Sequence, residues 1–179
     1  MSGIFAIVGP SGVGKDTLLE AVAKRCPAVH LVRRVITRPQ KAGGEDFERV
    51  SEAEFEARRA RGEFALSWRA HGLHYGIPAS VHEVLAGGRP VLFNGSRAAL
   101  AEAARTFPDL TVVHVTAAPD VLAARLSGRG RETPSEIEKR LERASISLPE
   151  GLRMVEIDNS GPLENAVARL VDLVQPASG

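Results

Sequence analysis

The stretch IFAIVGPSGVGKDTLLE near the start of the chain constrains the fold more than any other segment. Residues 4–8 form a short apolar run, which is typical of a strand buried on both faces. Glycines at positions 9, 12 and 14 follow, and residues 16–25 then show a helical pattern. A buried strand, a glycine-rich turn and a helix together are the setting of a phosphate-binding loop, G-x-x-x-x-G-K-[ST]. The pattern therefore predicts an ATP site, and the alternative is a glycine-rich turn with a chance lysine.

The residue after the lysine departs from this motif. Lys15 is expected to reach the β- and γ-phosphates of ATP, but Asp16 stands where a Ser or Thr hydroxyl usually binds Mg²⁺. A carboxylate is also a hard oxygen ligand, so we predict that Asp16 binds Mg²⁺ directly or through water. The alternative is an acidic residue that only suits the positive end of the helix dipole. The predicted ATP-binding residues are Gly9, Pro10, Ser11, Gly12, Val13, Gly14, Lys15, Asp16 and Thr17.

Strand and helix patterns alternate along the rest of the chain. Three further apolar runs read as buried strands, at 91–94, 111–115 and 153–157. Helical patterns separate them, including one over 52–61 that Ser51 and Glu54 are placed to cap, and one over 99–107. This alternation predicts an α/β fold, a three-layer sandwich with a mostly parallel central sheet.

The chain is expected to form a single domain with two additions to its core. Its 179 residues fit one domain. We predict a core made of residues 1–30 and 91–179, because the strand and helix patterns are clearest there. Residues 31–90 read less regularly and are expected to form an insertion on the sheet. A lid is expected at about 126–135.

Two arginine clusters accompany the predicted loop. Arg33, Arg34 and Arg38 lie in RRVITRP, and arginine forks suit the phosphate of an acceptor; the alternative is a solvated basic loop. A second cluster holds Arg125, Arg129, Arg131 and Arg140 around a short turn. Mobile arginine loops suit lids that close over a transferring phosphoryl group, and the alternative is an exposed helix hairpin. A phosphate acceptor is largely ionised at pH 7, so such a transfer requires no general base.

Composition narrows the class of protein further. The formal net charge is +1, which gives no reason to expect nucleic acid as a partner. No apolar run approaches the roughly 20 residues of a membrane span, and MSGIFAIVGP lacks the basic start of a signal peptide. Cys26 is the only cysteine, which excludes an intrachain disulfide. These features predict a cytoplasmic globular protein whose partner is a small molecule; the sequence does not indicate an oligomeric state.

Several segments together resemble the guanylate-kinase-like family. They are GPSGVGK, ITRP, GEFALSW…HGLHYG and RGRE…EIEKRL, in matching order over essentially the whole chain. The resemblance implies a P-loop core, an acceptor-binding insertion and a lid. It implies that Arg38 and Tyr75 bind the acceptor phosphate and that Arg125, Arg129 and Arg140 are the lid and catalytic arginines beside Lys15. DNSG at 158–161 matches the loop beside adenine.

The departures from guanylate kinases point to a narrower family. Leu66 stands where those enzymes read guanine with a carboxylate, and leucine accepts no hydrogen bonds. Asp16, the segment ALSWRAHGLHYG and the NGSR that begins at Asn94 instead resemble the ribose 1,5-bisphosphate phosphokinases. That resemblance implies ATP-dependent formation of 5-phosphoribosyl 1-diphosphate and a link to phosphonate breakdown. Arg97 in NGSR is predicted to reach the acceptor; the alternative is a surface arginine at a helix start.

Two other functions compete with this hypothesis. One is a nucleoside monophosphate kinase for GMP or dGMP, against which Leu66 argues. The other is a non-catalytic guanylate-kinase-like module that binds a partner protein in the acceptor cleft. Such modules tend to lose the P-loop lysine and the lid arginines, whereas this chain has both.

Overall fold

The central sheet is parallel, as the alternating pattern predicts. The structure is a computed structural model that describes residues 3–9, 13–38, 47–70, 72–118, 120–121, 124 and 153–175. Its strands run in the order β2 (His30–Leu31), β7 (Val91–Asn94), β1 (Ile4–Val8), β8 (Thr111–Thr116) and β9 (Arg153–Asp158). All four strands predicted from apolar runs are confirmed. Of the five described strands in this sheet, only β2 was not predicted, because its two residues are too few to show a periodic pattern.

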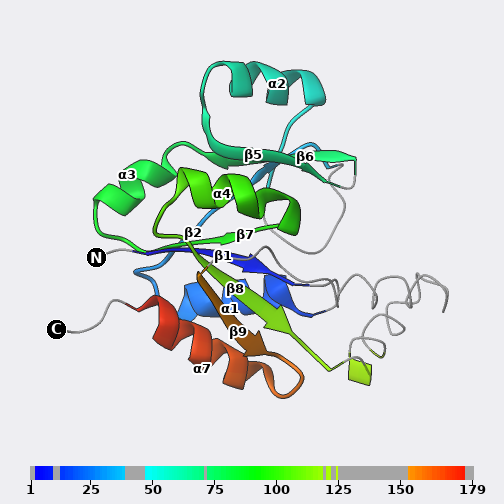
Figure 1. Cartoon of the computed structure of the whole chain (residues 1–179), viewed down its shortest axis with the longest axis vertical. Helices are drawn as coiled ribbons and strands as arrows, with labels where there is room; N and C mark the ends of the chain where they lie inside the picture. The colour runs from blue at the N-terminus through cyan, green and yellow to red at the C-terminus, as the bar shows by residue number, and fades with distance from the viewer. Residues whose placement is uncertain are drawn as a thin grey trace.

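The strands at the centre of this sheet are apolar on both faces because helices cover both sides. Every residue of β1 and β7 is buried. Helices α1 (Lys15–Arg25) and α7 (Leu163–Val174) pack on one face, where Leu18, Val22 and Leu170 are fully buried (Figure 1). The opposite face meets the short turn η1 (Arg97–Ala99) and helices α3 (Val81–Ala86) and α4 (Leu100–Thr106).

A second, smaller sheet lies beyond α3 and α4 (Figure 1). Its strand order is β4 (Glu48–Arg49), β3 (Val35–Ile36), β6 (Leu73–Pro78) and β5 (Phe64–Ala70). Strands β5 and β6 form an antiparallel pair, and β3 pairs antiparallel with β6 but parallel with β4. One face packs toward the central sheet, since Leu66 and Tyr75 join the same buried cluster as Phe93.

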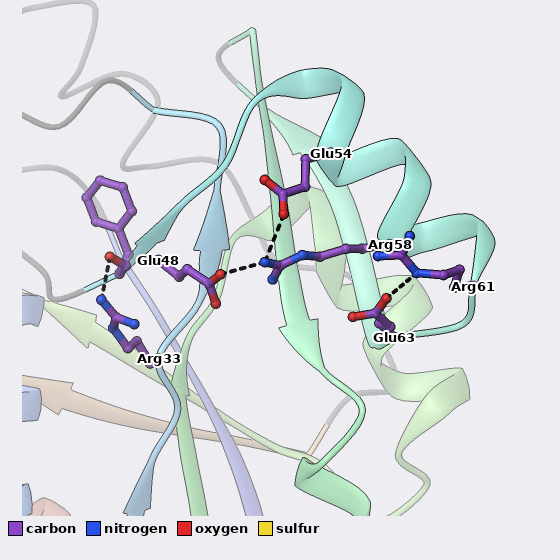
Figure 2. A network of polar contacts seen from close by, with 7 residues as sticks. Arg33, Glu48, Glu54, Arg58, Arg61 and Glu63 are labelled. Carbon is purple, nitrogen blue, oxygen red and sulfur yellow. Dashed lines mark hydrogen bonds and ion pairs between the residues drawn. The ribbon is translucent and has the colours of Figure 1, made fainter.

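Helix α2 (Glu52–Ala60) covers the other face of the small sheet. The predicted capping residue is confirmed, because Ser51 Oγ accepts a hydrogen bond from the Glu54 amide at 3.1 Å. Figure 2 shows Arg58 between two carboxylates, donating to Glu48 at 2.7 Å and to Glu54 at 3.2 Å. The hydrogen bond from Arg58 lowers the pKa of Glu48, and the same bond raises the pKa of Arg58. This pair fastens α2 to strand β4.

The topology determines where a ligand can bind. Strand β1 lies between β7 and β8, and all strands of the central sheet point the same way. Ligands of such sheets bind outside the carboxyl ends of the strands, at the point where the strand order reverses. In this chain that edge carries the segments that follow residues 8, 94, 116 and 158. Among the described residues no helix is both long and apolar enough to cross a membrane.

The division into a core, an insertion over 31–90 and a lid stays a proposal. One main-chain hydrogen bond shows where the chain leaves the central sheet. The Val32 amide donates to the Leu92 carbonyl at 3.0 Å, so the chain leaves the central sheet only after residue 32.

Candidate active site

Glycines stand at both described ends of the loop after β1. Gly9 lies so close to β8 that a Cβ there would be 2.5 Å from the Val115 carbonyl oxygen. Gly14 has φ of 90°, in the left-handed region, and immediately precedes α1. Both positions therefore require glycine, Gly9 for space and Gly14 for its backbone conformation. The loop then delivers the N-terminal end of α1 to the edge of the sheet.

Two side chains hold this loop in place. Lys15 Nζ donates to the Gly9 carbonyl at 2.9 Å, so its ammonium group reaches back across the loop. Asn159, which follows β9 and is only 4% exposed, donates through Nδ2 to the Val13 carbonyl at 2.8 Å. The asparagine thereby connects two segments that are 146 residues apart in the sequence. The Lys15 position agrees with the predicted role at the donor phosphates, which remains a prediction.

Asp16 lies in the first turn of α1 and faces the end of β7. Its Oδ1 accepts a hydrogen bond from Asn94 Nδ2 at 3.1 Å. Both residues line a small pocket of about 80 Å³ between α1 and the edge strand β2. The other lining residues are Leu19, Glu20, Leu31, Val32 and Arg33. The hydrogen bond from the Asn94 side-chain amide holds the Asp16 carboxylate in the first turn of α1, next to the phosphate loop.

The donor atoms fit Mg²⁺ bound together with a nucleotide rather than in a cage of protein ligands. No group of three or more His, Cys, Asp or Glu side chains able to hold a metal ion occurs in the described part of the chain. Mg²⁺ commonly takes one or two carboxylates and completes its shell with phosphate oxygens and water. Asp16, beside the cradle formed by Gly9 and Gly14, offers one such oxygen ligand.

A row of three side chains crosses the inner face of the small sheet. Tyr75 pairs across strands with Trp68, and their rings stack with centroids 5.4 Å apart and planes inclined by 6°. The guanidinium carbon of Arg34 lies 5.0 Å from the centroid of the Tyr75 ring. All three residues are at least nine-tenths buried. Two of the predicted acceptor residues, Arg34 and Tyr75, are thus brought together.

Arg38, the third predicted acceptor residue, lies beside another ring. Its guanidinium carbon is 5.3 Å from the centroid of the Phe47 ring. Arg33 donates to the Phe47 carbonyl at 3.3 Å, as Figure 2 shows. Two hydrogen bonds hold the strand end just before Arg38: the Thr37 amide donates to the His74 carbonyl at 3.2 Å, and the His74 amide donates to Thr37 Oγ1 at 3.0 Å.

Arg97 lies in η1, which follows β7 and packs against β5 of the small sheet. Arg97 is half-buried, and its positive charge affects the pKa of His114, a half-buried residue of β8. Burial lowers the pKa of the His114 imidazole, Glu156 opposes this shift, and Arg97 adds to it. The fourth predicted acceptor residue therefore stands between the central sheet and the small sheet.

Several predicted site residues lie outside the described residues: Pro10, Ser11, Gly12, Arg125, Arg129 and Arg140. The structure also identifies residues that the sequence analysis did not single out individually. Asn159 was noted only as part of DNSG, and Trp68 only as part of a family segment. His114 lies in a predicted strand, and a strand pattern alone does not show which residues lie near it. The register of β5 on β6 brings Trp68 beside Tyr75, and the register of β8 on β9 brings His114 beside Glu156.

Comparison with known proteins gives consistent results. A family model described as "AAA domain" matches residues 6–144. A guanylate kinase from Anaplasma phagocytophilum has a TM-score of 0.70 at 20% identity, covering 96% of this chain and 84% of that one, which shows a shared fold. The "Ribose 1,5-bisphosphate phosphokinase PhnN" of Ruegeria sp. (strain TM1040) is 53% identical, covering 96% of this chain and 91% of the relative. The protein of the same name from Agrobacterium fabrum (strain C58 / ATCC 33970) is 46% identical over 98% of both chains. On this similarity over nearly its whole length, the chain belongs to the ribose 1,5-bisphosphate phosphokinase family.

Proposed function

We propose that this protein transfers the terminal phosphoryl group of ATP to the 1-phosphate of ribose 1,5-bisphosphate, giving ADP and 5-phosphoribosyl 1-diphosphate. The observation that carries the proposal is the cradle made by Gly9, Gly14 and Lys15, in a chain so similar to two phosphokinases of that name. In the reaction an oxygen of the 1-phosphate attacks the terminal phosphorus of ATP, and the bond between that phosphorus and ADP breaks.

The donor side consists of the loop and the start of α1. Lys15 and the loop amides hold the β- and γ-phosphates, and the positive end of the α1 dipole adds to the attraction. Asp16 would hold Mg²⁺ through its carboxylate, which the hydrogen bond from Asn94 Nδ2 orients. The metal ion neutralises charge on the phosphates when bound. The hydrogen bond from Asn159 Nδ2 to the Val13 carbonyl ties the residue just before Gly14 to the segment after β9.

The acceptor side consists of the small sheet and η1. Arg38, Arg34 and Tyr75 bind the acceptor through its phosphate oxygens, and Arg97 reaches it from η1. Arg125, Arg129 and Arg140 stabilise charge on the transferring group, as the family resemblance implies. Because a sugar phosphate monoester is largely ionised at pH 7, the acceptor oxygen needs no general base. Rate enhancement then comes from positioning and charge neutralisation.

Leu66 favours this acceptor over a guanine nucleotide. It is 3% exposed and packs in the apolar cluster that also holds Trp68 and Tyr75. A guanine edge placed there would have its N–H donors unpaired, which is costly.

The phosphonate link and the cytoplasmic location, expected from the sequence, stay predictions.

The test is ADP release by the purified protein with Mg²⁺–ATP, with ribose 1,5-bisphosphate and GMP compared at matched concentrations. We expect strong preference for the sugar bisphosphate. Lys15→Ala should abolish turnover, whereas Lys24→Ala, which changes an exposed lysine of the same helix, should not. A preference for GMP would refute the proposed acceptor, and near-normal kcat in Lys15→Ala would refute the donor site.

A further inference from the structure

Trp68 carries a buried hydrogen-bond donor that the fold does not use. Its side chain is 8% exposed, and no partner for its indole Nε1 occurs in the described part of the chain. A buried N–H group without an acceptor costs free energy, and such a group in a native protein calls for an explanation. An oxygen of a bound ligand would satisfy this donor.

The neighbours of Trp68 are the residues proposed to bind the acceptor. It stacks on Tyr75, which in turn lies against the Arg34 guanidinium. The strand that carries Trp68 also packs against η1, where Arg97 lies. Leu66, two residues earlier in β5, is buried in the same cluster, as expected for residues that share one face of a strand.

We propose that Trp68 is a specificity-determining residue of the acceptor site, whose indole N–H donates a hydrogen bond to an oxygen of the bound sugar phosphate. This inference rests on the proposed function. The side chains of Leu66 and Trp68 together offer one donor and no acceptor. Phosphate and sugar oxygens accept hydrogen bonds from such a surface, whereas the N–H groups of a guanine edge find no partner on it. One strand face thus both selects the acceptor and rejects the base.

The chain is well suited to a direct test because Trp68 is its only tryptophan. A ¹H–¹⁵N spectrum of the labelled protein therefore contains a single indole signal. Titration with ribose 1,5-bisphosphate should move this proton signal downfield and saturate, as a new hydrogen bond forms. Mg²⁺–ADP alone should leave it near its starting position. The proposal would be overturned if the indole signal did not shift on addition of ribose 1,5-bisphosphate while the enzyme turns that compound over.

Kinetics supply a second and independent readout. Trp68→Phe keeps an aromatic ring against Tyr75 and removes the donor. We expect the KM for ribose 1,5-bisphosphate to rise about tenfold, with kcat and the KM for ATP within about twofold of wild type. Unchanged KM would refute the donor role.

A third form of the protein guards against misfolding of that variant. Replacing the single tryptophan by benzothienylalanine keeps a bicyclic ring of similar size and removes only the N–H. It should show the same rise in KM, and a normal KM would show that Trp68 only fills the core. If the wild-type protein releases no ADP with ribose 1,5-bisphosphate, the proposed function itself fails, and this inference fails with it.

Discussion

Replacing Gly14 by alanine should destabilise the protein more than the same replacement at Gly62, and the difference can be worked from the structure. Both residues have left-handed φ angles, 90° and 75°, so both replacements carry a similar backbone cost of about 1 kcal/mol. A Cβ on Gly62 meets no atom within 4 Å, whereas one on Gly14 lies 2.9 Å from Asn159 Nδ2. That nitrogen must move and weaken its buried bond to Val13, which adds about 1–2 kcal/mol.

Urea unfolding of the two variants measures this difference, and a double-mutant cycle identifies its origin. Once Asn159→Ala has removed the amide, Gly14→Ala should cost only the backbone term. The effects of Gly14→Ala and Asn159→Ala on the free energy of unfolding should therefore be non-additive by about 1 kcal/mol. The KM for ATP should rise in Gly14→Ala and stay normal in Gly62→Ala. Equal destabilisation by both glycine replacements, or full additivity in the cycle, would refute the idea that Asn159 fixes the loop.

Three further predictions follow from named contacts. Asp16→Asn keeps an oxygen that can accept the hydrogen bond from Asn94 but removes the negative charge, so the half-saturating Mg²⁺ concentration should rise about tenfold. The control Glu20→Gln should leave that concentration unchanged. An unaltered Mg²⁺ titration in Asp16→Asn would count against the metal role. Leu66→Glu would place a carboxylate in a buried apolar cluster, so the free energy of unfolding should fall by more than about 2 kcal/mol, and an unchanged free energy would show that this side chain is not buried. Because the hydrogen bond from Arg58 lowers the pKa of Glu48, this pair stabilises the fold above about pH 5 and loses its effect as the pH falls through that lowered pKa. The free energies of unfolding of wild type and Arg58→Ala, measured in urea, should therefore differ at neutral pH and approach each other in acid. A difference that does not change with pH would contradict the assignment.

Short, continuous apolar runs made the central sheet predictable. A buried parallel strand such as 4–8 is apolar at every position, and that pattern is visible in a single segment. The phosphate loop was predictable for the same reason, since strand, glycines and helix are contiguous. Ser51 was recognised because a helix cap depends on residues three positions apart.

The small sheet could not be derived from local patterns. Strands β3 and β4 have two residues each, and their existence depends on pairing with segments far along the chain. The row of Arg34, Tyr75 and Trp68 arises only from the register of β5 on β6 and the side-by-side placement of β3. Asn159 is similar, because nothing near DNSG indicates a bond to a loop that is 146 residues earlier.

Phosphorus NMR of the product formed from Mg²⁺–ATP and ribose 1,5-bisphosphate is the most direct test of the proposed reaction. We expect ADP together with a new sugar product that shows two coupled diphosphate signals and one unchanged monoester signal. These signals mean that phosphoryl transfer occurred at the 1-phosphate. A product without the coupled pair, or no product while GMP is converted to GDP, would contradict it.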